Sequence, residues 1–215
     1  MGYILSLIIA ITFHEFAHAF VADYLGDPTP RLQGRLTLNP RAHLDLYGSL
    51  LFLMLLISGS PVVLGWGKPV QFDPFNLQNP RRDSALISVA GPVSNLLMAL
   101  VASLGVRVLL VSTALPLSLS LFHGLTNFLS TLIVVNVTLA VFNLIPIHPL
   151  DGFKIVGGLL SPQQARDWHS LERYGMIFLL FLIFPIFGPA PVSLIINPVI
   201  KFLLQLFLPG SGGFV

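Results

Sequence analysis

Two histidines and a glutamate lie together in the stretch His14-Glu15-Phe16-Ala17-His18, which has the spacing H-E-x-x-H. Residues four apart share one face of a helix, so both imidazoles can reach a single metal ion. Glu15 lies about 100° round the helix from His14, near enough to contact a water bound to that ion. Catalytic zinc sites combine three protein ligands with one water, and zinc lowers the pKa of that water toward about 7. The stretch therefore predicts a metal centre at which Glu15 removes a proton from water.

The chain around this motif is too apolar for a water-soluble domain. Of its 215 residues, 54% are hydrophobic and 9% are charged, with a mean hydropathy of +0.85, whereas soluble domains carry about 25% charged residues. A bilayer is spanned by about 20 apolar residues. Apolar regions that approach or exceed this length can be drawn at 2–24, 46–65, 84–112, 119–146 and 174–208. Because prolines divide the last region, we expect an all-α polytopic membrane protein with five to six transmembrane helices.

The first apolar region contains the motif, and this has an energetic consequence. One ionisable group near the bilayer centre costs about 2.5–3.5 kcal/mol on insertion scales, and three such groups within one turn need compensation. A bound metal ion supplies that compensation. The alternative is a polar patch that lines a water cavity or bonds to a neighbouring helix.

Basic residues predict the orientation of the helices, because cytoplasmic loops are enriched in Lys and Arg. They lie on both sides of the second apolar region, within 31–41 and within 68–82. If both loops are cytoplasmic, region 46–65 must re-enter the same face, which the break at Gly59-Ser60-Pro61 permits; a conventional span is the alternative. The length of helix before His14 places it roughly 20 Å from the outer face and ~10 Å from the inner one. We expect a cell-membrane protein whose metal lies near the cytoplasm.

A third metal ligand must come from elsewhere in the chain, and it is not a cysteine because the chain has none. The candidates are His43, Asp45, His148 and Asp151. Asp151 is the strongest, because two prolines break the long apolar helix just before it, near the expected depth of the two motif histidines. The alternative for Asp151 is an N-cap of the following helix.

These motifs resemble the site-2 protease family of intramembrane zinc metalloproteases, of the peptidase M50 type. H-E-x-x-H on one membrane helix is followed on a later one by N-x-x-P-x-x-x-x-D-G, from Asn143 to Gly152. The stretch Ala90–Asn95 resembles the A-G-P-x-S-N sequence of the family's intervening helix. Three further stretches resemble a small prokaryotic subgroup without PDZ or CBS domains: Gly34-Arg-Leu-Thr-Leu-Asn-Pro40, His43-x-Asp45 and Gly65-Trp-Gly-Lys-Pro-Val70. The motifs that resemble the family lie between residues 11 and 160, approximately, and follow the same order.

The resemblance implies that His14, His18 and Asp151 bind one Zn²⁺ per chain and that Glu15 is the catalytic base. The implied reaction is hydrolysis of a peptide bond in or near the transmembrane segment of a single-span membrane protein within the lipid bilayer. We expect one membrane-embedded domain over 1–215. Its core would lie in about 1–160, with C-terminal helices in 174–208, and a homo-oligomer is compatible with this organisation.

Four further residues are candidates for supporting roles. Asn95 and Asn143 would hold the substrate backbone or orient the site; hydrogen bonds between helices are the alternative. His148 is a candidate to donate a hydrogen bond to a metal ligand or, less favourably, to bind the metal. We expect His43, together with Asp45, to hold the re-entrant loop together rather than to act on substrate.

A helical substrate needs new hydrogen-bond partners when it unwinds in lipid, because its exposed backbone groups are costly there. Addition of the peptide as a strand to an exposed edge supplies such partners. Residues 31–38 and 65–72 are short, contain glycine and partly alternate in polarity. They are therefore the expected short β element near the active site.

Two alternative functions follow from the same residues. A membrane metal-ion transporter would need further acidic or histidine groups across the membrane, whereas the cluster predicted here lies on one side. A non-catalytic metal-binding scaffold would not need Glu15, which is present. A nucleic-acid partner is not indicated, because 11 Lys and Arg stand against 9 Asp and Glu and no basic patch results.

Overall fold

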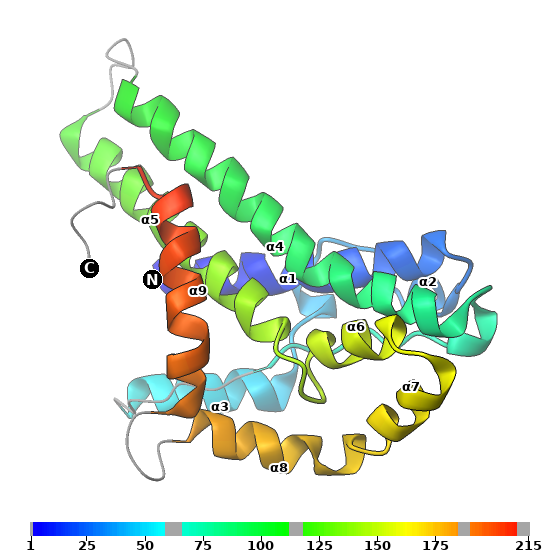
Figure 1. Cartoon of the computed structure of the whole chain (residues 1–215). Helices are drawn as coiled ribbons and strands as arrows, with labels where there is room; N and C mark the ends of the chain where they lie inside the picture. Colours follow the sequence, from blue (N-terminus) through cyan, green and yellow to red (C-terminus); the bar gives the residue numbers. More distant parts are fainter. Residues whose placement is uncertain (1, 59–65, 112–117, 185–189, 210–215) are drawn as a thin grey trace.

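All regular elements are helices in the computed structural model, which describes residues 2–58, 66–111, 118–184 and 190–209 (Figure 1). The α-helices are α1 (Gly2–Tyr24), α2 (Thr29–Leu32), α3 (Leu46–Ile57), α4 (Pro80–Val111), α5 (Leu119–Asn143), α6 (Asp151–Leu159), α7 (Pro162–His169), α8 (Glu172–Ile183) and α9 (Pro191–Phe207). Two short 3-10 turns, η1 (Pro40–Ala42) and η2 (Pro74–Asn76), lie in the connections. The expected all-α class is confirmed for these residues.

Within the described ranges, three helices are long and apolar enough to cross a membrane, namely α1, α4 and α5. They correspond to the first, third and fourth apolar regions of the sequence. The second region forms α3, whose 12 residues are fewer than the roughly 20 that a full span needs. The break expected at 59–61 lies outside the described residues.

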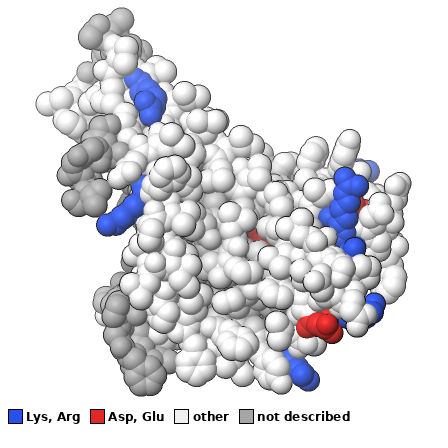
Figure 2. All heavy atoms as spheres, viewed as in Figure 1, with Lys and Arg blue, Asp and Glu red and all other residues white. Residues whose placement is uncertain are grey.

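The helices α1, α4, α5 and α6 pack together around the middle of the molecule, with α4 in contact with each of the other three (Figure 1). Small buried residues line the contacts, among them Ala10, Ala19, Ala99 and Ala102, and small residues allow membrane helices to approach closely. Figure 2 shows that most of the face in view is uncharged, with Lys and Arg gathered mainly toward its ends. Both features suit a helix bundle whose outer surface meets lipid.

The expected β element is replaced by irregular structure. Among the described residues, β pairing is limited to one isolated antiparallel bridge between Leu44 and Gly67. The prediction of an extended segment over 31–38 is wrong at its start, which lies in α2. Pro30 favours this helix because a proline in the first turn lacks only an N–H that would have had no helical partner. A turn at Gly34 then follows, with φ at +68°.

The connections on either side of α3 are tied to each other by Arg35. Its buried guanidinium donates hydrogen bonds to the carbonyl oxygens of Ala42 and Lys68. The backbone N–H of Lys68 donates to the carbonyl of His43 over 2.7 Å. His43 is fully buried, and its Nε2 lies 2.7 Å from the carbonyl of Thr37. These bonds hold the segment that begins at Gly67 against the loop before α3.

Asp27 anchors the far end of that segment. Its fully buried carboxylate accepts hydrogen bonds from the Thr29 hydroxyl (2.6 Å) and backbone N–H (3.1 Å), the Asp73 backbone N–H (2.7 Å) and the Asn76 amide (2.8 Å). Burial acts to raise the pKa of Asp27, but these hydrogen bonds outweigh it and hold the pKa below its ordinary value. The ionised carboxylate therefore stabilises the fold.

We expect Asp27→Asn to destabilise the protein by about 1–3 kcal/mol near neutral pH. The amide N–H groups of asparagine cannot accept hydrogen bonds, so some of the donors around residue 27 would lose their acceptor. The contribution of Asp27 is present above its unfolded-state pKa of about 3.9 and is lost as pH falls through the lower folded-state pKa. The gap in Tm between the two proteins should therefore narrow in acid. Thermal unfolding in detergent micelles at several pH values measures this difference in Tm. The control is Asp167→Asn, because Asp167 is exposed. A gap that stays constant with pH would contradict this role.

Candidate metal centre

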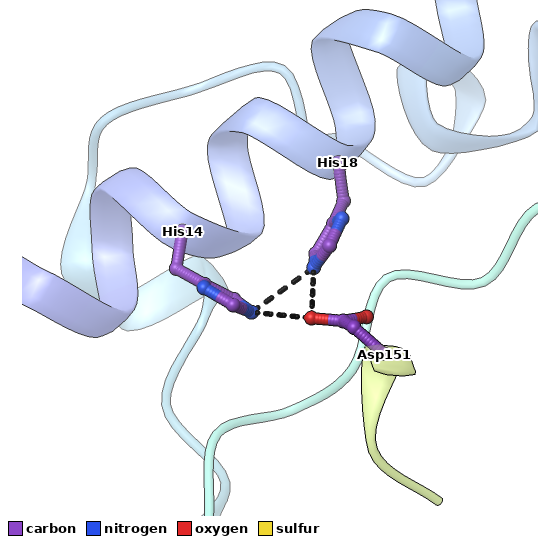
Figure 3. A group of neighbouring side chains, drawn as sticks. All are labelled: His14, His18 and Asp151. Atoms are coloured by element: carbon purple, nitrogen blue, oxygen red, sulfur yellow. Dashed lines mark hydrogen bonds and ion pairs between the residues drawn. The ribbon is translucent and has the colours of Figure 1, made fainter. Parts of the chain in front are cut away.

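Helix α1 brings two imidazoles together with the carboxylate that opens α6 (Figure 3). The Nε2 atoms of His14 and His18 lie 3.0 Å apart. Asp151 Oδ2 lies 3.1 Å from the first and 3.2 Å from the second. Both histidines are buried. The structure thus joins the three residues that the sequence proposed as metal ligands, and they come from elements far apart in the chain.

The tautomers of both histidines follow from their outer partners. His14 Nδ1 lies 2.7 Å from Asn95 Oδ1, and His18 Nδ1 lies 2.7 Å from the carbonyl of Ile87. Both partners are acceptors, so each Nδ1 carries the proton and donates it. In the neutral ring each Nε2 is then a lone pair directed at Asp151 Oδ2. Lone pairs and a carboxylate held this close repel one another unless a metal ion or a proton lies between them.

The arrangement fits a zinc ion. Zinc bonds of about 2.0–2.2 Å in a tetrahedron place ligand atoms roughly 3.3 Å apart, close to the separations in the cluster. Asp151 Oδ2 is buried and accepts no hydrogen bond, which is the state expected of an oxygen that a metal would bind. The N-cap of α6 is Leu150, without a side-chain capping bond, so Asp151 does not serve as the cap that was its alternative interpretation. Two imidazoles and a carboxylate are also a common donor set for catalytic zinc.

Asn95 fixes the orientation of His14 from the opposite helix. Its side chain is fully buried, and its Nδ2 donates to the carbonyl of Ala10 at 3.1 Å and to Asn136 Oδ1 at 2.9 Å. These two bonds assign Oδ1 as the atom that faces His14. Asn95 is therefore placed to orient a metal ligand, and outer partners of this kind keep a ligand ring in one tautomer.

Glu15 lies beside the metal ligands but outside the cluster. Its Oε2 accepts a hydrogen bond of 3.0 Å from the backbone N–H of Val70, and the carboxylate also approaches Gly67. The carboxylate is thus held by the segment that Arg35 and Asp27 anchor at its two ends. This position suits a base that acts on a water next to the metal.

The structure does not bring the other four sequence candidates to the ligands. Asp45 accepts a hydrogen bond of 2.8 Å from the backbone N–H of Gly48. Asn143 donates to the carbonyl of Leu139 on its own helix at 2.9 Å. His148 precedes a cis peptide bond to Pro149 and packs edge-on against Phe153, with ring centroids 5.7 Å apart. Among the described contacts of Asn143, His148 and His43, none reaches a metal ligand.

Three contributors to the site were missed by sequence reasoning. Asn136 is a buried polar residue in an apolar helix, and that is a signal which could have assigned it to the site. The other two, the carbonyl of Ile87 and the N–H of Val70, are backbone groups, and their use leaves no trace in residue type.

Helix α4 passes the ligands at Gly91, where no side chain fits. A Cβ there would lie 2.5 Å from both His14 Cε1 and His18 Nε2, well inside the normal contact distance of about 3.5 Å. We expect Gly91→Ala to displace the imidazoles and to weaken zinc binding by about 10–100-fold, comparable to the loss of an outer hydrogen-bond partner.

Competition with a chromophoric chelator measures this zinc affinity. The control is Gly105→Ala on the same helix, because its Cβ would meet only the flexible end of Leu129 at 3.2 Å. Equal zinc affinity in the two variants would contradict the role assigned to Gly91.

Comparison with known proteins gives an independent finding. The family model described as "Peptidase family M50" matches residues 108–183, which include Asp151. A protein of Bacillus subtilis named "Putative zinc metalloprotease YwhC" is 38% identical over 179 residues, which cover 83% of this chain and 78% of that protein. The chain belongs to peptidase family M50.

Mycobacterial relatives of this M50 peptidase carry the name "Putative zinc metalloprotease Rip2". The Mycobacterium tuberculosis protein is 33% identical over 175 residues and the Mycolicibacterium smegmatis protein 30% identical over 184 residues. The M50 peptidase covers 63% and 64% of their respective lengths. No solved structure matches the chain. The resemblance to the site-2 protease family, drawn from the motifs, is confirmed.

Proposed function

We propose that this M50 peptidase is an intramembrane zinc metalloprotease that hydrolyses a peptide bond in or near the transmembrane segment of a membrane protein. The observation that carries the proposal is the convergence of His14 Nε2, His18 Nε2 and Asp151 Oδ2 at the middle of the helix bundle. The relatives named as zinc metalloproteases support the same metal.

Each residue of the site has a distinct part in this reaction. Zinc at the site would polarise the peptide carbonyl and make a bound water more acidic. Glu15 would take the proton of the attacking water and pass it to the leaving amine. Asn95 and the carbonyl of Ile87 keep both imidazoles in the tautomer that offers Nε2. The N–H of Val70 holds Glu15 in place during the proton transfers.

The residues directly after Val70, Gln71 and Phe72, would receive the substrate. Among the described residues, no hydrogen bond occupies the backbone groups of Gln71 and Phe72. A peptide that unwinds beside them would find partners for its own N–H and C=O groups, as in strand addition. The scissile bond would then lie next to Glu15, because Val70 is one residue before Gln71 and holds the base.

The topology that we propose is a single multi-pass domain in the cell membrane. Residues 46–65, with the short helix α3 at their start, would re-enter the face on which they begin. The metal would lie near the cytoplasmic side, where the basic residues on both sides of this region would also lie. The substrate would be a single-span membrane protein, and each chain would hold one Zn²⁺.

Metal removal tests the proposal. The purified protein is placed in liposomes with a single-span test substrate, and cleavage products are followed by mass spectrometry. We expect a membrane-permeable chelator to stop cleavage and added Zn²⁺, but not Mg²⁺, to restore it, because the donor set contains two imidazoles. A soluble peptide with the same cleavage sequence should be cut more slowly. Cleavage that is insensitive to the chelator would overturn the proposal.

A further inference from the structure

A groove with a cavity volume of about 930 Å³ runs beside the metal centre. One wall is the irregular segment Pro69–Phe72, and the others come from the start of α4 and from α6 and α7. The side chains of Val70 and Phe72, together with several prolines, make its apolar surface. Its volume lies near the upper end of the roughly 300–1,000 Å³ of small-ligand pockets, so a few residues of an extended peptide would fit.

Two lining residues connect the groove to the candidate metal centre. Val70 contributes to its wall, and the backbone N–H of the same residue holds Glu15. On the opposite side, Lys154 lies one helical turn after the metal ligand Asp151 and also lines the groove. The Lys154 ammonium lies 4.7 Å from the centroid of the Phe72 ring. A peptide whose scissile bond meets Glu15 would therefore continue along this groove.

The groove carries an excess of positive charge, with three Lys and Arg against one Glu. The ionisable residues that line it are Arg81, Lys154, Arg166, His148, His169 and Glu172. The one acidic member, Glu172, pairs with His169 at 2.8 Å, and the Arg166 guanidinium donates to the neutral side chain of Gln163. No acidic side chain pairs with Arg81, Lys154 or Arg166 in the described parts of the chain.

This concentration of charge is unusual for so apolar a protein. Only 11 of its 215 residues are Lys or Arg, and three of these line one groove next to the metal centre. Unpaired cations on low-dielectric walls attract negatively charged ligands. The backbone of Gln71 and Phe72 is open for pairing, which a lipid headgroup would not use but an extended peptide would.

We propose that this groove binds an acidic segment of the substrate that flanks its transmembrane helix, with carboxylates of the segment against Arg81, Lys154 and Arg166. The proposal rests on the proteolytic function and adds a substrate class to it: membrane proteins with Asp or Glu close to the cleavage site. Carboxylates accept charge-assisted hydrogen bonds from guanidinium and ammonium groups, and complementary charge contributes more to specificity than to affinity.

Two substrates with one transmembrane helix test this site, one with an acidic flank and one in which the flank's Glu and Asp are replaced by Gln and Asn. For the double variant Arg81→Gln/Lys154→Gln, we expect kcat/KM on the acidic substrate to fall about three- to tenfold through KM, the scale of two partly exposed ion pairs. Cleavage of the neutral substrate should not change. Arg82→Gln is the matched control, because Arg82 is an exposed neighbour outside the groove. Equal loss on both substrates, or no loss, would overturn the proposal.

A charge reversal and a binding measurement complete the test. Lys154→Glu should reduce cleavage of the acidic substrate and improve cleavage of one with a Lys-rich flank. Fluorescence anisotropy of a labelled acidic peptide in detergent micelles should show weaker binding to the double variant, and this readout does not depend on catalysis. If the double variant binds the acidic peptide as tightly as the wild type, the proposed site is refuted. This conclusion holds even if the protein cleaves no substrate. The double variant could also lose cleavage only in vesicles that contain phosphatidylglycerol, and equally for both substrates. That result would assign the groove to lipid instead.

Discussion

Glu15→Gln is expected to abolish peptide hydrolysis while zinc stays bound at about one ion per chain, because Glu15 is not among the three ligands that fill a zinc site. The glutamine has the same shape, and its amide oxygen can still accept the Val70 N–H that the carboxylate accepts at 3.0 Å. It cannot take up a proton at neutral pH. Loss of a general base costs about 10²–10⁴-fold in rate.

The measurement combines initial rates in liposomes with zinc analysis of the same preparation. Asp23→Asn is the control on the same helix, since Asp23 pairs with the exposed guanidinium of Arg31, and an ion pair with one solvent-exposed partner contributes little. A variant that keeps the wild-type rate would remove Glu15 from the mechanism. A variant that loses zinc would show instead that Glu15 maintains the metal centre.

Asp151→Asn is expected to lower zinc affinity by more than about 100-fold. Removal of a residue that only hydrogen-bonds to a metal ligand already lowers metal affinity by about 10–100-fold, and Asp151 would itself be a ligand. The substitution removes the one negative charge of the cluster and leaves two neutral imidazoles. In the absence of metal, the variant should be no more stable than wild type, because the carboxylate at 3.1 and 3.2 Å can pair with a protonated imidazole and the amide cannot.

Zinc-dependent thermal unfolding separates these effects. A ligand that binds only the folded protein raises its stability by RT ln(1 + [L]/Kd), so Tm of the wild type should rise with zinc and Tm of Asp151→Asn should not. Asp167→Asn, an exposed acid on α7, should keep the wild-type response. A full zinc-induced shift in Asp151→Asn would exclude Asp151 as a ligand.

Much of the helical architecture can be predicted from hydropathy, because an apolar run of sufficient length has few other stable forms in lipid. Regions 2–24, 84–112 and 119–146 correspond to α1, α4 and α5. The start of α2 shows the limit of this reasoning. Its helix depends on Pro30 in the first turn and on the Asp27 carboxylate, whose partners Asp73 and Asn76 lie far away in the sequence.

The metal ligands could be predicted because each ligand has a distinctive side chain, whereas the supports of the site were only partly predictable. Asn136 and Asn143 are seven residues apart and so lie on nearly the same face of α5. The first reaches Asn95 at 2.9 Å, but the second is two turns farther along and bonds to its own helix. Sequence spacing gives the face of a helix but not which turn of it lies opposite a partner.

The order in which the ribosome makes the chain gives the metal centre a strict sequence of assembly. Helix α1 is made before α4 and carries two ligands and the base, but neither Nδ1 has its partner until α4 supplies Asn95 and Ile87. The carboxylate of Asp151 arrives only when α6 is made. A nascent chain that ends before residue 151 therefore lacks a three-ligand site. We therefore expect zinc to bind tightly only after α6 has been made and has packed against α1.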